Sequence, residues 1–237
     1  MLWRKAKESE TMGSENQKAE AAKKALDFVK DGMILGLGTG STSEFFVKFL
    51  AEKAKKENFS KLICASTSNK TTSLAESLDL KVMPIQKIKK IDLAVDGADE
   101  VDEKKQLLKG LGGYAFVKEK AVDYKAKKFV VIVDEAKLVK ELSKPVLVEC
   151  RKEKTEKVMK EVEKKFKAKV EQLMEGNEKK ISENGNYLLS AKIENVSNKA
   201  KKLEKEIEAI EGVVGSGLFT RDCTVIVGKE NKAEILK

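Results

Sequence analysis

Apolar residues along the chain recur with two alternating spacings, one typical of amphipathic helices and one typical of short buried strands. Helical spacing predicts helices at residues 15–30, 43–57, 70–78 and 116–125. Short apolar runs between them predict strands at 33–35, 61–65, 81–83, 91–95 and 128–133. Strands that alternate with helices along the chain predict an α/β fold with a Rossmann-like, largely parallel sheet.

The pattern changes after a short helix near residues 135–142. Strands are predicted at 145–150, 168–174, 186–194 and from 213 onward, with helices at 153–166 and 198–210. This βαββαβ order is typical of a ferredoxin-like module, and a strand at 223–227 is expected to rejoin the first sheet. We therefore predict a disordered tail at 1–14, a Rossmann-like catalytic domain at 15–143 plus 216–237, and a smaller ferredoxin-like α+β domain at 144–215.

The first strand ends in a turn rich in glycine and hydroxyl groups, GLGTGSTS at residues 36–43, which leads into a helix. Glycines allow a sharp turn, and the N–H groups and dipole at the start of the helix attract an anion. A phosphate is therefore expected there, with further donors from the hydroxyls of Thr39, Ser41, Thr42 and Ser43. Ser41 replaces the third glycine of a dinucleotide fingerprint, and no Gly-Lys-Ser/Thr follows, so both nucleotide motifs fail. A strand–helix corner without a ligand explains the glycines but leaves the hydroxyl groups unexplained.

Three carboxylates directly follow the strand at 91–95, in the sequence DGADE at residues 96–100. Ligands of open α/β sheets gather beyond the carboxyl ends of strands, so Asp96 and Asp99 are candidates for substrate contact. A second glycine-rich turn, KGLGG at 109–113, begins with Lys109, and Glu119 lies in the first turns of the helix after it. A carboxylate near a helix N-terminus suits a general base. The alternative for DGADE is an Asx-rich turn that caps a helix. The alternative for Lys109 and Glu119 is that both are ordinary surface side chains.

Composition limits the chemistry that these residues can perform. The chain of 237 residues has no histidine, and its three cysteines, at 64, 150 and 223, are read as reduced core residues. Zinc, haem and histidine-based sites are therefore not expected, and acid–base chemistry must use carboxylates, lysine, tyrosine or cysteine.

The charge pattern and the lengths of the apolar runs argue against nucleic acid and membrane as partners. A net charge of +9 arises from 48 basic and 39 acidic residues that are interspersed, which indicates solvated helix faces. Aromatic residues make up only 5% and do not alternate with basic residues, so no nucleic-acid platform is expected. No apolar run approaches the roughly 20 residues of a membrane span, and no secretory segment is recognised, so we expect no membrane partner and a cytoplasmic location.

Taken together, these motifs resemble ribose-5-phosphate isomerase, type A. The resemblance runs in order through GTGST at 38–42, DGADE at 96–100, KG-x-GG at 109–113, the pair Glu119-Lys120 and VDEAK at 133–137. It continues to the closing GVV at 212–214 and GLF at 217–219. The segment from Lys109 to Glu119 is one residue longer than the family pattern, with Leu111 and Tyr114 where small residues are usual.

The resemblance implies reversible conversion of D-ribose 5-phosphate and D-ribulose 5-phosphate through an enediolate, without a metal or organic cofactor. Glu119 would be the general base, Lys109 would stabilise the enediolate oxygen, and Asp96 and Asp99 would bind sugar hydroxyls and assist ring opening. The remaining implied substrate contacts are Thr39, Gly40, Ser41, Thr42, Gly97, Ala98, Gly110, Leu111, Gly112, Lys18 and Lys137. The resemblance also implies a homodimer or homotetramer.

Two other functions stay open at this point. Effector domains of similar fold sense phosphosugars without converting them, although such regulators carry a helix-turn-helix for which residues 1–35 have too little room. The lysine-rich helices at 153–166 and 198–210 could instead serve nucleic-acid binding or assembly, which salt-dependent binding would reveal.

Overall fold

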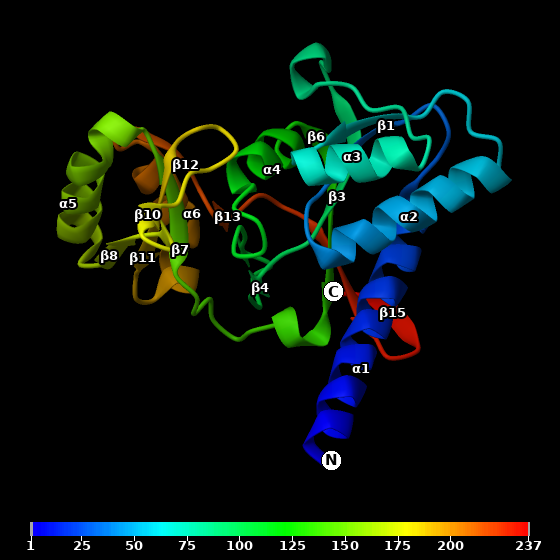
Figure 1. Cartoon of the computed structure of the whole chain (residues 1–237), viewed down its shortest axis with the longest axis horizontal. Coiled ribbons are helices and arrows are strands. Elements are labelled where there is room, and N and C mark those ends of the chain that lie inside the picture. Colours follow the sequence, from blue (N-terminus) through cyan, green and yellow to red (C-terminus); the bar gives the residue numbers. More distant parts are fainter. Residues whose placement is uncertain (1, 237) are drawn as a thin grey trace. The chain divides into compact units, whose positions relative to one another are not determined.

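The computed structural model describes the backbone of residues 2–236 and the side chains of residues 14–236 (Figure 1). Contacts within the chain group it into two compact units. The first unit contains the chain up to Gly97, the segment Ala121–Lys137 and the chain from Asp222 onward. The second contains Ala98–Lys120 and Leu138–Arg221. The predicted tail at 1–14 lies almost wholly outside the residues with described side chains and stays a prediction.

A six-stranded sheet with the order β15-β14-β6-β3-β1-β2 forms the centre of the first unit. Its strands are β1 (Ile34–Leu37), β2 (Ile63–Ser66), β3 (Ile91–Asp96), β6 (Ala126–Asp134), β14 (Thr224–Lys229) and β15 (Lys232–Ile235). All neighbours pair in parallel except β14 and β15, which pair antiparallel. The predicted parallel sheet is confirmed, and so is the return of the last predicted strand to it. The predicted strand at 81–83 is reduced to one bridge between Val82 and Cys64.

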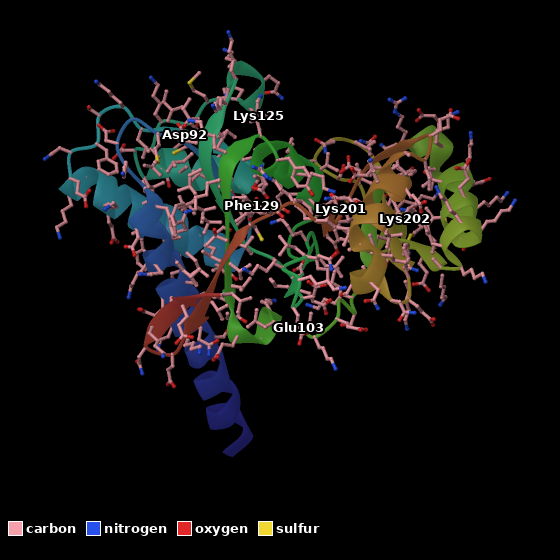
Figure 2. The ribbon with its side chains drawn as sticks, turned by 180° about the vertical axis from the view of Figure 1, so that it is seen from behind. Asp92, Glu103, Lys125, Phe129, Lys201 and Lys202 are labelled. Atoms are coloured by element: carbon pink, nitrogen blue, oxygen red, sulfur yellow. The ribbon has the colours of Figure 1, made fainter. Side chains whose placement is uncertain are left out.

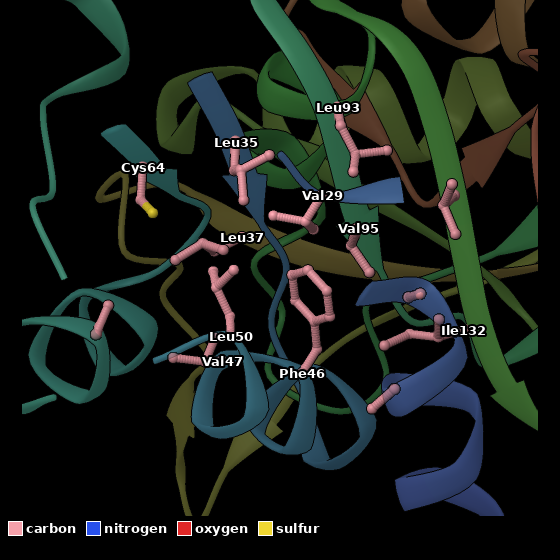
Figure 3. Close-up of a cluster of buried hydrophobic side chains, with 14 of the residues drawn as sticks. Val29, Leu35, Leu37, Phe46, Val47, Leu50, Cys64, Leu93, Val95 and Ile132 are labelled. Carbon is pink, nitrogen blue, oxygen red and sulfur yellow. The ribbon is translucent and has the colours of Figure 1, made fainter. Parts of the chain in front are cut away.

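Helices cover this sheet with apolar stripes that follow their sequence spacing. They are α1 (Leu2–Ala25), α2 (Ser41–Lys56) and α3 (Asn69–Ser77), with the short turns η1 (Leu26–Phe28), η2 (Ile85–Lys87) and η3 (Glu135–Lys137). Phe46 and Leu50, one helical turn apart on α2, pack with Leu35 and Leu37 of β1 and are fully buried (Figure 3). This core fixes where α2 begins relative to the end of β1.

The helix α1 packs closely against β14. A methyl group built on Gly228 of β14 would lie 1.7 Å from the main-chain oxygen of Gln17 in α1. Only a residue without a side chain allows this approach, because main-chain atoms cannot move aside cheaply. Gly228 therefore sets the distance between the first helix and one of the last strands.

The second unit contains the predicted ferredoxin-like module. Its elements follow the order β7 (Val146–Cys150), η4 (Lys152–Lys154), α5 (Thr155–Phe166), β8 (Lys169–Gln172), β11 (Tyr187–Lys192), α6 (Val196–Glu208) and β12 (Val213–Ser216). The four strands form an antiparallel sheet in the order β12-β7-β11-β8. This arrangement confirms the βαββαβ prediction. A small hairpin of β9 (Met174–Glu175) and β10 (Glu178–Lys179) is inserted before β11.

Three two-residue strands in the second unit have no counterpart in the predicted elements. They are β4 (Glu100–Val101), β5 (Leu107–Leu108) and β13 (Leu218–Phe219), in the order β13-β5-β4. Because β5 pairs with β13, residues 98–120 group by their contacts with the second unit, whereas the predicted boundaries placed them in the first domain. The helix α4 (Phe116–Asp123) follows β5 and runs across the division at Lys120.

Within the described part of the chain, no helix has the length and apolar character needed to cross a membrane.

Candidate active site

The glycine-rich turn at residues 36–43 connects β1 to α2. It lies where the strand order of the parallel sheet reverses. β2 and β3 lie on opposite sides of β1, so the carboxyl ends of β1 and β3 form the topological switch point at which ligands of such sheets bind. Gly40 caps α2 with φ of 113° and provides no capping side chain. The amides of the first helical turn are therefore left for an anion. The hydroxyls of Ser41 and Thr42 make no hydrogen bond within the described residues.

Asp96, at the end of β3, fastens this turn. Its carboxylate oxygen Oδ1 accepts hydrogen bonds from the Thr39 N–H at 3.0 Å, the Ser43 hydroxyl at 3.2 Å and the Gly97 N–H at 2.7 Å. Asp96 is fully buried, and a methyl group on Gly38 would lie 1.9 Å from the same Oδ1 atom. Asp96 thus shapes the glycine-rich turn between β1 and α2, a structural role that the sequence analysis did not predict.

A second hydroxyl-rich turn lies beside the first. The Thr39 hydroxyl lies 2.7 Å from that of Thr67 and 2.8 Å from that of Ser68. Ser68 caps α3 by accepting from the Thr71 N–H at 3.2 Å, and the Thr71 hydroxyl donates to Gly38 O at 3.0 Å. The start of α3 is therefore tied to the turn before α2, and these hydroxyls were missing from the predicted site.

Lys18 and Lys137 are half-buried and make no ion pair within the described residues. Lys18 lies on α1 next to Gln17, whose side-chain oxygen accepts from the Glu135 N–H at 3.4 Å. Glu135 opens η3, the turn that contains Lys137. The structure thus brings the segments that carry these two lysines together at the ends of β6 and β14.

The second glycine-rich turn belongs to the second unit and is also fastened by a carboxylate. Asp99 accepts from the Leu111 N–H at 2.8 Å through Oδ2, and its own N–H donates to Leu108 O at 2.8 Å. Gly110 has φ of 108°, and a methyl group there would lie 2.6 Å from the ring of Phe116. Leu111 is exposed, and Gly112 has open space around it.

Lys109 and Glu119 form a buried ion pair on either side of this turn. The Lys109 Nζ atom lies 3.5 Å from Glu119 Oε2, and the two residues are 3% and 5% exposed. Lys109 follows β5, and its N–H donates to Gly217 O at 2.8 Å, while the Glu119 N–H donates to Ala115 O at the start of α4. A carboxylate base next to an ammonium group, both shielded from water, is suited to moving a proton and stabilising the oxyanion that results.

Two of the three cysteines are not candidates for this chemistry, whereas Cys223 is only half-buried and is not the core residue that was predicted. Cys64 and Cys150 are buried, and burial raises the pKa of the Cys64 thiol to about 12. Burial is also the main cause that raises the pKa of Cys150. Among the described residues, no group of three or more His, Cys, Asp or Glu residues is placed to hold a metal ion.

A cleft of about 310 Å³ lies away from all of these residues, between α5 and α6 of the second unit. It is lined by Phe166, Leu203, Glu206 and four lysines, Lys165, Lys167, Lys199 and Lys202. Lys202, which Figure 2 labels on α6, is exposed and lies 3.9 Å from Glu206. None of the predicted site residues lines this cleft.

Comparisons with known proteins agree with the motifs. The family of ribose 5-phosphate isomerase A (phosphoriboisomerase A) matches residues 63–232. A relative named ribose-5-phosphate isomerase A from Pyrococcus horikoshii is 37% identical over 220 residues, covering 91% of this chain and 95% of its own. Another of that name, from Methanocaldococcus jannaschii, is 37% identical over 231 residues, covering 95% and 100%.

Solved structures agree as well. A D-ribose-5-phosphate isomerase in complex with phospho-erythronic acid has a TM-score of 0.89 at 37% identity, over 94% of this chain and 99% of its own. Ribose 5-phosphate isomerase A from Methanocaldococcus jannaschii has a TM-score of 0.88 at 35% identity, over the same shares. The chain therefore belongs to the ribose 5-phosphate isomerase A family.

Proposed function

We propose that this enzyme interconverts D-ribose 5-phosphate and D-ribulose 5-phosphate, with Glu119 as the general base. Family membership supports the aldose–ketose isomerisation, and the buried Lys109–Glu119 pair, 3.5 Å apart, is the observation that carries the assignment of the base. Both groups are nearly inaccessible to water, which strengthens their electrostatic effect on a reacting sugar.

The proposed reaction moves one proton between neighbouring carbons of the open-chain sugar. The Glu119 carboxylate removes the proton from C2 of the aldose, the C2–H electron pair forms the C1–C2 double bond, and negative charge develops on O1. The Lys109 ammonium stabilises this enediolate oxygen. Glu119 then returns the proton to C1, and the proton on O2 passes to O1, directly or through solvent, which leaves a hydroxyl group on C1 and a ketone at C2. Proton removal by a positioned carboxylate and stabilisation of the developing negative charge both lower the barrier to this reaction.

The remaining residues are assigned to binding. The turn of Thr39, Gly40, Ser41 and Thr42, with the first amides of α2, would hold the phosphate, assisted by Lys18 and Lys137. Asp96, Asp99 and the backbone at Gly97, Ala98 and Gly110–Gly112 would contact the sugar. The free hydroxyls of Ser41 and Thr42 and the capping glycine before α2 support the phosphate assignment.

The test is turnover of ribose 5-phosphate by the purified chain with a metal chelator present. We expect conversion by the wild type, with deuterium entering the product in D₂O, and a loss of kcat of about 10²-fold or more in Glu119→Gln, as expected for removal of a general base. Glu103→Gln, an exposed carboxylate in the same unit (Figure 2), is the matched control and should keep wild-type turnover.

Two outcomes would contradict the proposal in different ways. Full turnover by Glu119→Gln would show that another group is the base. Binding of ribose 5-phosphate without turnover by the wild type would favour a sugar-phosphate sensor. A cytoplasmic location and a homodimer or homotetramer are proposed with the function, and light scattering of the purified chain tests the assembly.

A further inference from the structure

The ring of Phe219 contacts the ammonium groups of two lysines in the second unit. The ammonium of Lys109 lies 5.4 Å from the ring centroid, and that of Lys120 lies 4.7 Å from it. Phe219 belongs to β13 and is fully buried, and Lys109 is 3% exposed. Because the face of an aromatic ring attracts cations most strongly where water is excluded, this ring attracts both ammonium groups.

Lys120 is also held in place by oxygen atoms. Its ammonium group contacts Glu204 Oε1 at 2.7 Å and Glu208 Oε1 at 2.5 Å, both on α6, and it donates to Leu218 O at 2.7 Å. Glu204 is held in turn by the N–H and hydroxyl of Thr220, the residue after Phe219. The contacts run without a break from α6 through Lys120 and Phe219 to Lys109, which pairs with Glu119.

We propose that Phe219 is a positioning residue for the reaction, which holds the Lys109 ammonium beside Glu119 through its ring face while Lys120 and α6 hold the ring. This inference rests on the proposed roles of Lys109 and Glu119. An aliphatic side chain could fill the same volume, but it would not attract a cation. Phe219 appears in the closing GLF of the sequence resemblance, yet nothing in its spacing indicates a contact with Lys109.

The sharpest test keeps the ring and weakens its attraction for cations. Fluorine atoms withdraw charge from the face of the ring with little change in its size, so we would replace Phe219 with mono-, di- and trifluorophenylalanine in the full chain. We expect kcat to fall with each added fluorine, by between about twofold and thirtyfold at three, the range that a cation–π contact spans. KM should change by less than about twofold, since the ring is fully buried and not accessible to a substrate.

A second measurement separates positioning from packing. A less firmly held Lys109 stabilises the enediolate oxygen less well, so variants without a cation-binding ring face should lose kcat and keep KM. Phe219→Tyr, which keeps a cation-binding face, should retain more kcat than Phe219→Leu. Trifluorophenylalanine at Phe46, a fully buried ring with no cation–π contact in the described part of the chain, is the control and should leave kcat unchanged.

The outcomes distinguish this inference from the function on which it rests. If wild-type turnover requires Glu119 but the fluorinated series has a constant kcat, Phe219 is only a core residue and the inference is wrong. If Glu119→Gln keeps full turnover, the assignment of the base fails first, whatever the fluorinated series shows.

Discussion

Asp96 and Asp99 each accept a hydrogen bond that holds a glycine-rich turn in place. Asp96 accepts from the Thr39 N–H at the first turn, and Asp99 accepts from the Leu111 N–H at the second. The two residues are three positions apart in the chain, so one short segment helps to shape both turns. This explains why several carboxylates follow one strand, since each has backbone donors to satisfy in addition to any contact with a sugar.

The hydroxyls of Ser41 and Thr42 provide a prediction at the same scale. In the double variant Ser41→Ala/Thr42→Ala, we expect KM for ribose 5-phosphate to rise at least about tenfold, because losing even one of the two hydrogen bonds to a charged group has an effect of that size. The change in kcat should be smaller, because a phosphate is held equally in the ground and transition states. Steady-state kinetics measures both constants.

The control for this variant is Ser73→Ala/Ser77→Ala, which removes two exposed hydroxyls from α3 in the same unit. It should leave KM unchanged. An unchanged KM in the Ser41/Thr42 variant would instead mean that the phosphate binds elsewhere.

Helices and strands with a clear hydrophobic period could be predicted from the sequence. Elements that form only by pairing with distant segments could not. The parallel sheet and the βαββαβ module follow from helical and strand spacings that persist over many residues. The strands β4, β5 and β13 have two residues each and form only because they pair with one another across the chain. Their absence from the prediction also explains why residues 98–120 were placed with the first domain.

The candidate site could also be predicted only in part, for the same reason. Glycines, hydroxyls, Lys109 and Glu119 could be picked out because their residue types are tied to a chemistry. The hydroxyls of Thr67 and Ser68 were visible in the sequence, but their contact with Thr39 depends on how β1 and β2 align in the sheet. The cation contacts of Phe219 come from residues about a hundred positions away and leave no local signal.

The packing of α1 on β14 gives a prediction for an element. In Gly228→Ala, the added methyl would lie 1.7 Å from Gln17 O and 3.0 Å from the Ala21 nitrogen, both main-chain atoms. The helix must therefore shift, and we expect the free energy of unfolding to fall by about 1–3 kcal/mol. Thermal unfolding followed by circular dichroism measures the loss.

Gly112→Ala is the matched control for stability, because no atom lies within 4 Å of the added methyl group. It should unfold close to the wild-type temperature. Equal unfolding temperatures for Gly228→Ala and the wild type would contradict the close packing of α1 on β14.

Across the whole molecule, exposed ion pairs give the chain a dependence on pH. Hydrogen bonds from Lys154 and Lys157 lower the pKa of Glu211 from 4.5 to about 2. Hydrogen bonds from Lys229 and Lys232 lower the pKa of Glu234 to about 2 in the same way. Since the folded pKa lies below the unfolded one, the unfolded chain binds more protons in this range. The stabilisation is present above about pH 4.5 and is lost as the pH falls toward 2.

We therefore expect the unfolding temperature to fall less between pH 6 and pH 3 in Glu211→Gln/Glu234→Gln than in the wild type. Both carboxylates are exposed, so salt should screen their four ion pairs, and the difference should shrink at 1 M NaCl, where the Debye length is about 3 Å. Glu194→Gln/Glu230→Gln, which removes two exposed carboxylates outside the described ion pairs, is the control. An equally steep fall in the Glu211/Glu234 variant and the wild type would contradict the prediction.

The contact between Gln17 and Gly228 has a consequence for how the chain is made. At synthesis rates of about 5–20 residues per second, β14 leaves the ribosome roughly 10 to 40 s after α1. Throughout that interval the nascent helix lacks the strand on which it packs, and β6 lacks its neighbour in the sheet. Truncated messages and stalled ribosomes should therefore release chains whose exposed apolar faces bind chaperones or aggregate.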